Sequence, residues 1–244
     1  MHFFDEVFHW FTTASNWSGS NGIPELFLRQ AELAIAVVIG TLIVGGGLGV
    51  VLGHTGRGGL VAVNAANAFR AVPTLALLTL LAIQPSISLT WGGFLASWLA
   101  LSILAIPPIL TNTYVGMREV DADVRDAAKA MGLTGGEVLR RVEVPLALPF
   151  VMTGVRTASI EVVATSTLAA FVSYTDLGTY VIAGLNTGDN VEAFCGAVLV
   201  AALAGIVAVA LGVAQRALTP LPMRRPRAGR GPLGGGTREL ATLD

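Results

Sequence analysis

Long stretches without a charged residue divide the chain into segments that match the thickness of a lipid bilayer. Residues 33–56 contain no Asp, Glu, Lys or Arg, and the apolar part of this stretch ends near Leu52. Residues 71–117 also lack these four residue types, but they are too long for one helix and are interrupted by Gln84-Pro85-Ser86. Because about 20 apolar residues cross a bilayer as a helix, this pattern predicts membrane-spanning helices.

The pattern predicts an all-α fold, a polytopic transmembrane helix bundle of about five spans. The spans are expected at about 33–52, 60–83, 91–114, 146–172 and 193–214. The mixed and aromatic residues 1–30 form an extracytoplasmic or interfacial segment, and the short stretch 177–185 is a candidate for dipping into the membrane. The transmembrane domain is expected at 31–215. Residues 216–244, rich in Arg, Pro and Gly, are predicted to be a disordered tail.

Composition strengthens the membrane interpretation. Hydrophobic residues make up 53% of the 244 residues and charged residues only 13%, whereas soluble domains carry about 25% charged residues. A soluble enzyme and a disordered chain are therefore excluded. The net charge of −1 predicts no nucleic-acid partner, and the single cysteine excludes an internal disulfide. We predict no metal site, and His54 is interpreted as an ordinary loop residue.

The placement of the basic residues predicts the orientation in the membrane. With five spans, 12 of the 15 Lys and Arg residues fall on one side, in loops 53–59 and 115–145 and in the tail, and Arg29 stands alone on the other. Basic residues are retained on the cytoplasmic side of a bilayer. We therefore expect the N-terminus outside the cell and the C-terminus in the cytoplasm.

The charged loop 115–145 is the candidate for function. Residues 120–131 predict an amphipathic helix whose apolar face contains Val124, Ala127, Ala128 and Met131. Gly132 ends this helix, and Thr134 with Glu137 three residues later is a capping-box pattern that starts a second one. Pro145 and Pro149 mark the entry into the fourth span. A helical hairpin that projects from a membrane bundle is suited to docking in a groove of another protein.

This loop resembles the coupling-loop signature of binding-protein-dependent ABC importer permeases. That signature is Glu-Ala-Ala, three residues, Gly, nine residues and Ile-x-Leu-Pro, and every spacing matches here. The matching residues are Asp126, Ala127, Ala128, Gly132, Val142, Val144 and Pro145. Residues 71–78, 108–114, 142–149 and 154–158 are most similar to the osmoprotectant branch, which carries glycine betaine, choline and related quaternary amines. Arg70 and Glu161 depart from that branch.

The resemblance implies a type I, methionine-importer-like permease in the bacterial inner membrane. It further implies a second permease subunit, identical or related, two ATPase subunits that bind ATP-Mg, and an extracytoplasmic substrate-binding protein. The chain itself would be a transport subunit and not an enzyme, with no cofactor, and it contains no Gly-x4-Gly-Lys-Ser/Thr phosphate loop. The alternatives are a permease for another small solute, such as an amino acid or methionine, a secondary transporter, or a membrane enzyme.

Several residues inside the spans are candidates for packing or for the solute pathway. Gly45, Gly49 and Gly53 recur every four residues, which permits close approach of helices. Pro73 and Pro107-Pro108 predict kinks or breaks, and broken helices often line a pathway. Charges within a span face an interior or a wet cavity, and three are candidates: Arg70, Arg156 and Glu161. Glu161 either lines the pathway and favours a cation or pairs with Arg70, and Arg156 either faces the pathway or snorkels. Arginines of the tail either touch anionic lipid headgroups or only fix the topology.

Overall fold

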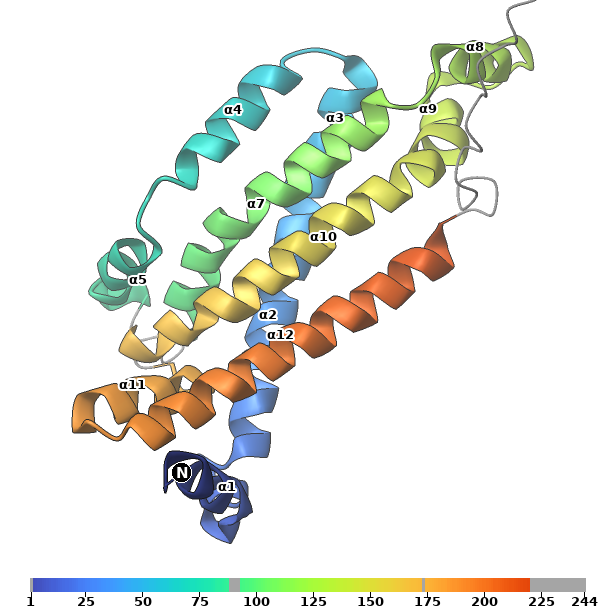
Figure 1. Cartoon of the computed structure of the whole chain (residues 1–244). Coiled ribbons are helices and arrows are strands. Elements are labelled where there is room, and N and C mark those ends of the chain that lie inside the picture. Colours follow the sequence, from blue (N-terminus) through green and yellow to red (C-terminus); the bar gives the residue numbers. More distant parts are fainter. Residues whose placement is uncertain (1, 88–92, 173, 220–244) are drawn as a thin grey trace, which may run out of the picture.

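The structure is a computed structural model that describes residues 2–87, 93–172 and 174–219. Every regular element within these ranges is helical, which confirms the all-α prediction. Four of the described helices are long and apolar enough to cross a membrane, and a bent helix pair makes a fifth span if it is counted as one. The long helices run side by side as an elongated bundle (Figure 1).

The first long helix consists of α2 (Ile23–Thr41), a π-helical turn (Leu42–Gly46) and α3 (Gly47–Thr55). It begins ten residues before the predicted start at Leu33. Pro24 stands in the first turn, where its missing N–H costs no hydrogen bond. The prediction started the span after the charged residue Glu32, yet the helix extends further back. Within this earlier part Gln30 is fully buried, and its Nε2 donates to Val163 O at 2.9 Å and Ser166 Oγ at 2.9 Å.

The predicted second span is broken at Pro73. Helix α4 (Gly59–Phe69) and helix α5 (Thr74–Ala82) are bent by 77° across the break. Pro73 itself has an extended backbone and is the N-cap of α5. A proline cannot continue the hydrogen-bond ladder of the preceding helix, so the sequence accounts for this break.

The third span, α7 (Phe94–Arg118), is a continuous helix that contains Pro107 and Pro108 without a break. The predicted start at Trp91 lies outside the described residues. Asn112 Nδ2 donates to Pro108 O at 2.8 Å within this helix.

The fourth span is longer than predicted. Helix α9 (Gly135–Val138), a π-helical turn (Leu139–Glu143), α10 (Val144–Ser166) and a 3-10 turn (Thr167–Val172) form one helical segment of 38 residues. The helix therefore begins before the predicted entry of the span near Leu146, and Pro145 does not interrupt it. Pro145 falls in the first turn of α10 directly after the wider π turn, so the chain tolerates the proline without ending the helix.

The remaining helices define the two ends of the bundle (Figure 1). Helix α1 (His2–Thr12), α5, α11 (Gly178–Thr187) and the start of α12 (Asn190–Leu218) lie at one end. Helices α8 (Ala122–Ala130) and α9 lie at the opposite end, beside the ends of α3 and α7. Of the predicted tail, residues 216–218 belong to α12, Thr219 is the C-cap of that helix, and residues 220–244 lie outside the described residues.

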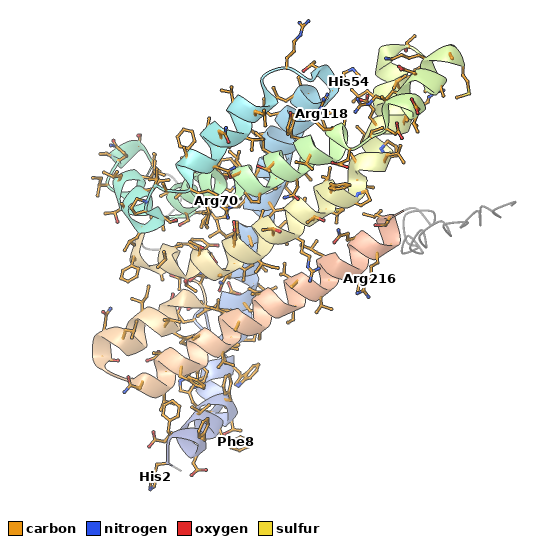
Figure 2. All side chains as sticks on the ribbon, turned by 45° about the horizontal axis from the view of Figure 1, so that its top comes forward. His2, Phe8, His54, Arg70, Arg118 and Arg216 are labelled. Carbon is orange, nitrogen blue, oxygen red and sulfur yellow. The ribbon has the colours of Figure 1, made fainter. Side chains whose placement is uncertain are left out.

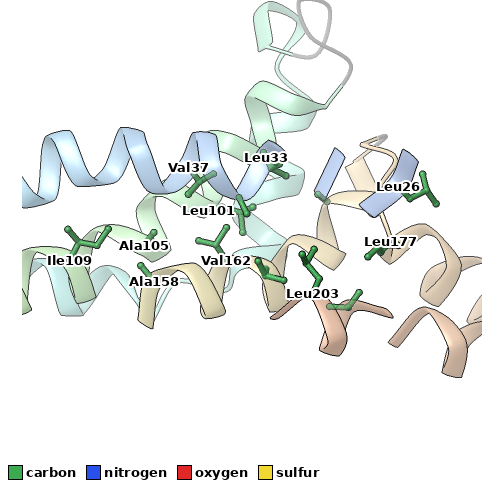
Figure 3. Close-up of a cluster of buried hydrophobic side chains, with 14 residues drawn as sticks. Leu26, Leu33, Val37, Leu101, Ala105, Ile109, Ala158, Val162, Leu177 and Leu203 are labelled. Carbon is green, nitrogen blue, oxygen red and sulfur yellow. The ribbon is translucent and has the colours of Figure 1, made fainter. Parts of the chain in front are cut away.

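The core is a narrow seam between α2, α7, α10 and α12 (Figure 3). Fully buried side chains from these helices include Val37, Leu101, Val162 and Leu203. The outer faces of α2 and α12 are also apolar but exposed, as at Ile39 and Val209. Large exposed apolar faces are stable only when lipid or another subunit covers them.

Candidate coupling and pathway sites

The projecting helix α8 presents part of its apolar face to the surroundings. Asp121 caps the helix by accepting a hydrogen bond from the N–H of Asp123 at 3.0 Å. Val124 and Met131 are 42% and 76% exposed, and Ala127 is exposed too, whereas Ala128 is buried. The predicted single apolar face is therefore divided between an inward residue and an outward apolar surface, which we call the α8 outer face: Val124, Ala127 and Met131.

A glycine turn joins α8 to α9, as the sequence predicts. Gly132 has φ +91°, and its N–H donates to Lys129 O at 2.9 Å, while the N–H of Leu133 donates to Ala128 O at 3.3 Å. Glycine adopts this left-handed conformation without a steric penalty. The predicted capping box is confirmed, since the N–H of Thr134 donates to Glu137 Oε2 at 3.0 Å and Thr134 Oγ1 does so at 2.9 Å.

The other signature residues lie along α8 and at the start of α10. Asp126 is exposed, with its Oδ1 3.4 Å from Lys129 Nζ. Val142 lies in the π turn and Val144 and Pro145 begin α10; both valines are partly buried and the proline is exposed. Helix α8 packs against α9 and against the π turn, so the two halves of the signature are neighbours in space.

A buried carboxylate beneath α8 was missed in the sequence. The side chain of Glu143 is only 3% exposed; its Oε1 lies 2.9 Å from Arg125 Nε and its Oε2 lies 2.6 Å from His54 Nδ1. Arg125 Nη2 also donates to the backbone oxygen of Met117. A buried charge is costly unless it is paired, and here two helices, α3 and α8, supply the partners. We call Glu143, Arg125 and His54 the Glu143 cluster.

The structure brings Arg70 and Glu161 together. Arg70 Nη2 and Glu161 Oε1 form an ion pair between the C-cap of α4 and helix α10. The two side chains are 38% and 28% exposed, and Glu161 Oε2 is buried without a hydrogen-bond partner among the described residues. Figure 2 shows Arg70 partway along the bundle, away from His54. The ion pair was one of the two predicted roles of Glu161.

Arg156 lies on another side of α10. Its Cζ is 3.5 Å from the position that a Cβ would take at Gly212, so its guanidinium lies over α12. Gln215, also on α12, donates from Nε2 to two acceptors on α10, Pro149 O at 3.0 Å and Thr153 Oγ1 at 2.8 Å. Arg156 is thus placed along the α10–α12 contact.

The three glycines of the first span face α7. A Cβ at Gly45 would lie 3.2 Å from Ile106 O, and one at Gly49 would lie 2.7 Å from Thr113 Cβ. A Cβ at Gly53 would clash with Met117 Cβ. These positions leave little or no space for a side chain between the two helices.

A second buried carboxylate lies at the α11 end and was also missed. Asp176 is fully buried in the connector before α11, where its Oδ1 accepts from the N–H of Gly178 at 2.8 Å. Burial raises the pKa of Asp176 to about 7, against the opposing effect of the hydrogen bond from Gly178. No periodicity marks this residue, because it lies between helices.

The architecture defines the class of protein. A bundle of membrane-spanning helices with a short helical projection at one end is the fold of a type I ABC importer permease. The chain is similar to a structure titled "Inward facing conformations of the MetNI methionine ABC transporter", with a TM-score of 0.69 and 23% identity, over 79% of this chain and 94% of that chain. At this identity the likeness shows the fold alone.

The family follows from the sequence comparisons. Residues 29–221 match the family described as "Binding-protein-dependent transport system inner membrane component", and the chain belongs to this family. It is 38% identical over 191 residues to the "Choline transport system permease protein OpuBB" of Bacillus subtilis, covering 78% of this chain and 85% of the relative. It is 37% identical over 186 residues to the "Glycine betaine/carnitine/choline transport system permease protein OpuCB" of the same organism, covering 76% and 83%.

These comparisons confirm the resemblance predicted from the coupling-loop signature. Membership of the family makes the chain a multi-pass membrane transport subunit and implies ATPase and substrate-binding partners.

Proposed function

We propose that this chain is the permease subunit of an ATP-driven importer for osmoprotectants such as glycine betaine, choline or related quaternary amines. The observation that carries the proposal is the 38% and 37% identity, across more than three quarters of the chain, to permeases named for these solutes. The methionine importer supports only the fold, so it gives no reason to prefer an amino-acid solute.

In the proposed assembly, the α8 outer face docks on an ATPase subunit. Val124 and Met131 are apolar side chains held open on a helix whose other side is fixed to the bundle. An exposed apolar helix face is the usual ligand of a groove on a partner. Two ATPase subunits would bind ATP-Mg, and a second permease, identical or related, would complete the pathway below an extracytoplasmic substrate-binding protein.

The proposed orientation places α8 in the cytoplasm of a bacterial cell, with the complex in its inner membrane. Arg57, Arg118, Arg140 and Arg141 lie in the loops and helix ends near α8, which agrees with retention of basic residues on the cytoplasmic side. The N-terminus would then be outside and the C-terminus cytoplasmic.

The proposed pathway passes the Arg70–Glu161 ion pair and the helix break at Pro73. Both charges belong to segments that are expected within the membrane, and both remain partly exposed in the single chain. Facing lipid would be costly for either charge, so this side of the bundle is proposed to face the pathway between the two permeases. The carboxylate of Glu161, whose side chain is 28% exposed, would attract the cationic head of a quaternary amine.

Co-purification with the ATPase encoded beside this chain tests the docking. The ATPase should remain bound through detergent purification, and Met131→Asp should release most of it, because a charge would enter an apolar contact. Phe8→Asp, which alters a comparably exposed apolar residue at the opposite end, should leave the ATPase bound. An ATPase that never co-purifies, or that is equally retained by Met131→Asp, would contradict the proposal.

The solute is tested with the substrate-binding protein encoded beside the chain. Choline or glycine betaine should bind it, and an amino acid such as methionine should not. Preferential binding of the amino acid would assign the permease to the alternative solute class.

A further inference from the structure

The Glu143 cluster lies between α8 and the membrane-spanning helices. Helix α8 packs against α9 and the π turn Leu139–Glu143. Arg125 follows Val124 of the α8 outer face directly in sequence, yet its Nε lies 2.9 Å from the buried carboxylate of Glu143. One side of α8 is therefore free for a partner while the other is bound to the start of α10 by an ion pair.

The same carboxylate connects α8 to the first span. Glu143 Oε2 lies 2.6 Å from His54 Nδ1, in the last turn of α3. Because an ionised carboxylate only accepts hydrogen bonds, the proton of this contact is on His54 Nδ1. Arg125 also donates to the backbone of Met117 near the end of α7. A displacement of α8 thus acts on α3, α7 and α10 at one point.

We propose that the Glu143 cluster transmits the displacement of α8 to the membrane-spanning helices, with Glu143, Arg125 and His54 acting as positioning residues for coupled transport. This inference rests on the proposed function, because it assumes that an ATPase moves α8. The coupling-loop signature does not include these three residues. Glu143 occupies its variable position between Val142 and Val144, and Arg125 and His54 lie outside it.

The local backbone suits this role. Glu143 ends a π-helical turn inside an otherwise α-helical segment, and such turns are frequent at functional sites. From Glu143 the helix continues to Glu161, 18 residues later, a rise of about 27 Å at 1.5 Å per residue. The Arg70–Glu161 ion pair therefore lies on the same continuous helix as the Glu143 cluster, with no break between them.

The test uses the complete importer reconstituted in proteoliposomes, with both ATP hydrolysis and solute uptake measured. Glu143→Gln removes the negative charge of the cluster with little change of shape, and Arg125→Gln removes the positive charge and the guanidinium group that contacts Glu143. We expect the ATPase to remain bound and active, while solute uptake per ATP hydrolysed falls about fivefold or more, within the usual range of coupling free energies. The double variant should fall no further than Glu143→Gln alone, because both changes break one interaction.

The matched control is Arg29→Gln, which breaks the exposed Glu25–Arg29 pair at 3.0 Å on α2. Its uptake per ATP should equal that of the unaltered importer. If Glu143→Gln does not accumulate as an assembled complex, Arg125→Gln and His54→Ala, which remove a partner and leave the carboxylate, replace it in the test. Arg125→Lys keeps a charged donor and should retain more uptake per ATP than Arg125→Gln. Unchanged uptake per ATP in the assembled variants, or additive losses in the double variant, would overturn the inference.

Failure of the proposed function gives a different result. If the unaltered complex transports another solute, uptake per ATP is measured with that solute and the prediction for Glu143→Gln stands. If the unaltered complex binds no ATPase, the proposed function fails and this inference fails with it.

Discussion

Gly49 and Thr113 face each other across the contact between the first span and α7, at a distance that admits no methyl group. A Cβ on Gly49 would lie 2.7 Å from Thr113 Cβ and 3.0 Å from Leu110 O. Helices without a hydrophobic driving force between them gain stability from such close packing. Substitution of Gly49 therefore tests whether the first span packs against α7 as closely as the structure shows.

Gly49→Ala should destabilise the permease by about 1–3 kcal/mol, the usual cost of an added methylene in a packed contact. Thermal unfolding of the purified complex in detergent measures this change. Gly47→Ala is the matched control, because a Cβ there meets nothing within 4 Å and alanine favours a helix more than glycine. Equal melting temperatures for the two variants would contradict the packing of the first span against α7.

Gly132→Ala should weaken the docking of the ATPase. The φ of +91° at Gly132 costs an L-residue about 1–2 kcal/mol, so the variant is expected to shift the turn that orients α8. Less ATPase should co-purify, whereas Gly136→Ala, in open space within α9, should retain it. Full retention by Gly132→Ala would show that the orientation of α8 does not depend on this turn.

Glu161→Gln should reduce uptake of choline about tenfold, which corresponds to ~1.4 kcal/mol. The physical reason is loss of the negative charge that the account places on the pathway. The measurement is uptake by the reconstituted importer, with ATP hydrolysis followed in parallel. Unchanged uptake would remove Glu161 from the pathway.

The reversed pair, Arg70→Glu with Glu161→Arg, separates a pathway charge from a purely structural ion pair. It should restore the thermal stability lost in the single variants, because opposite charges still meet between α4 and α10. It should not restore choline uptake, because a positive charge then replaces Glu161. Recovery of uptake together with stability would assign the pair a structural role only.

Asp176 predicts a pH dependence of stability at the α11 end. Burial raises its folded pKa from 3.8 to about 7, so the folded state favours the protonated acid. Its stabilising contribution is fully present below pH 3.8 and is lost as the pH rises through about 7, with an upper limit on the order of 4 kcal/mol. Melting temperatures between pH 5 and pH 8 should therefore fall with rising pH.

Asp176→Asn should flatten this slope, because an amide oxygen still accepts from Gly178 but does not ionise. The exposed helix cap Asp189→Asn is the control, since its side chain is already solvated, and it should leave the slope unchanged. A slope that persists in Asp176→Asn would assign the pH dependence to another group.

The spacing of charged residues predicted most of the membrane-spanning helices, but it did not predict where these helices begin and end. The break at Pro73 and the turn at Gly132 were predicted, because proline and glycine act on the backbone locally. The start at Ile23 and the continuity across Pro145 were missed. Buried Gln30 and Glu143 have partners on other helices, and a rule that ends a span at a charged residue contains no information about such partners.

The sequence predicted the part of the candidate site that is local in the chain and missed the part formed by distant residues. The signature located α8 and the residues from Asp126 to Pro145, since it is a pattern of neighbours along the chain. His54 was interpreted as an ordinary loop residue, although it meets Glu143 across 89 positions. A contact between residues so far apart in sequence is set by the packing of α3 and of α10 against α7, which one sequence does not reveal.

The central claim, coupled import of an osmoprotectant, is tested most directly by uptake of labelled choline and glycine betaine into proteoliposomes. The liposomes contain this permease, its partner permease and the ATPase, and the loaded binding protein is added on the side opposite the ATPase. The account predicts accumulation of at least one of these solutes that requires ATP and is abolished by deleting residues 126–136. Uptake that proceeds without ATP, or ATP-driven uptake of an amino acid in place of both solutes, would contradict it.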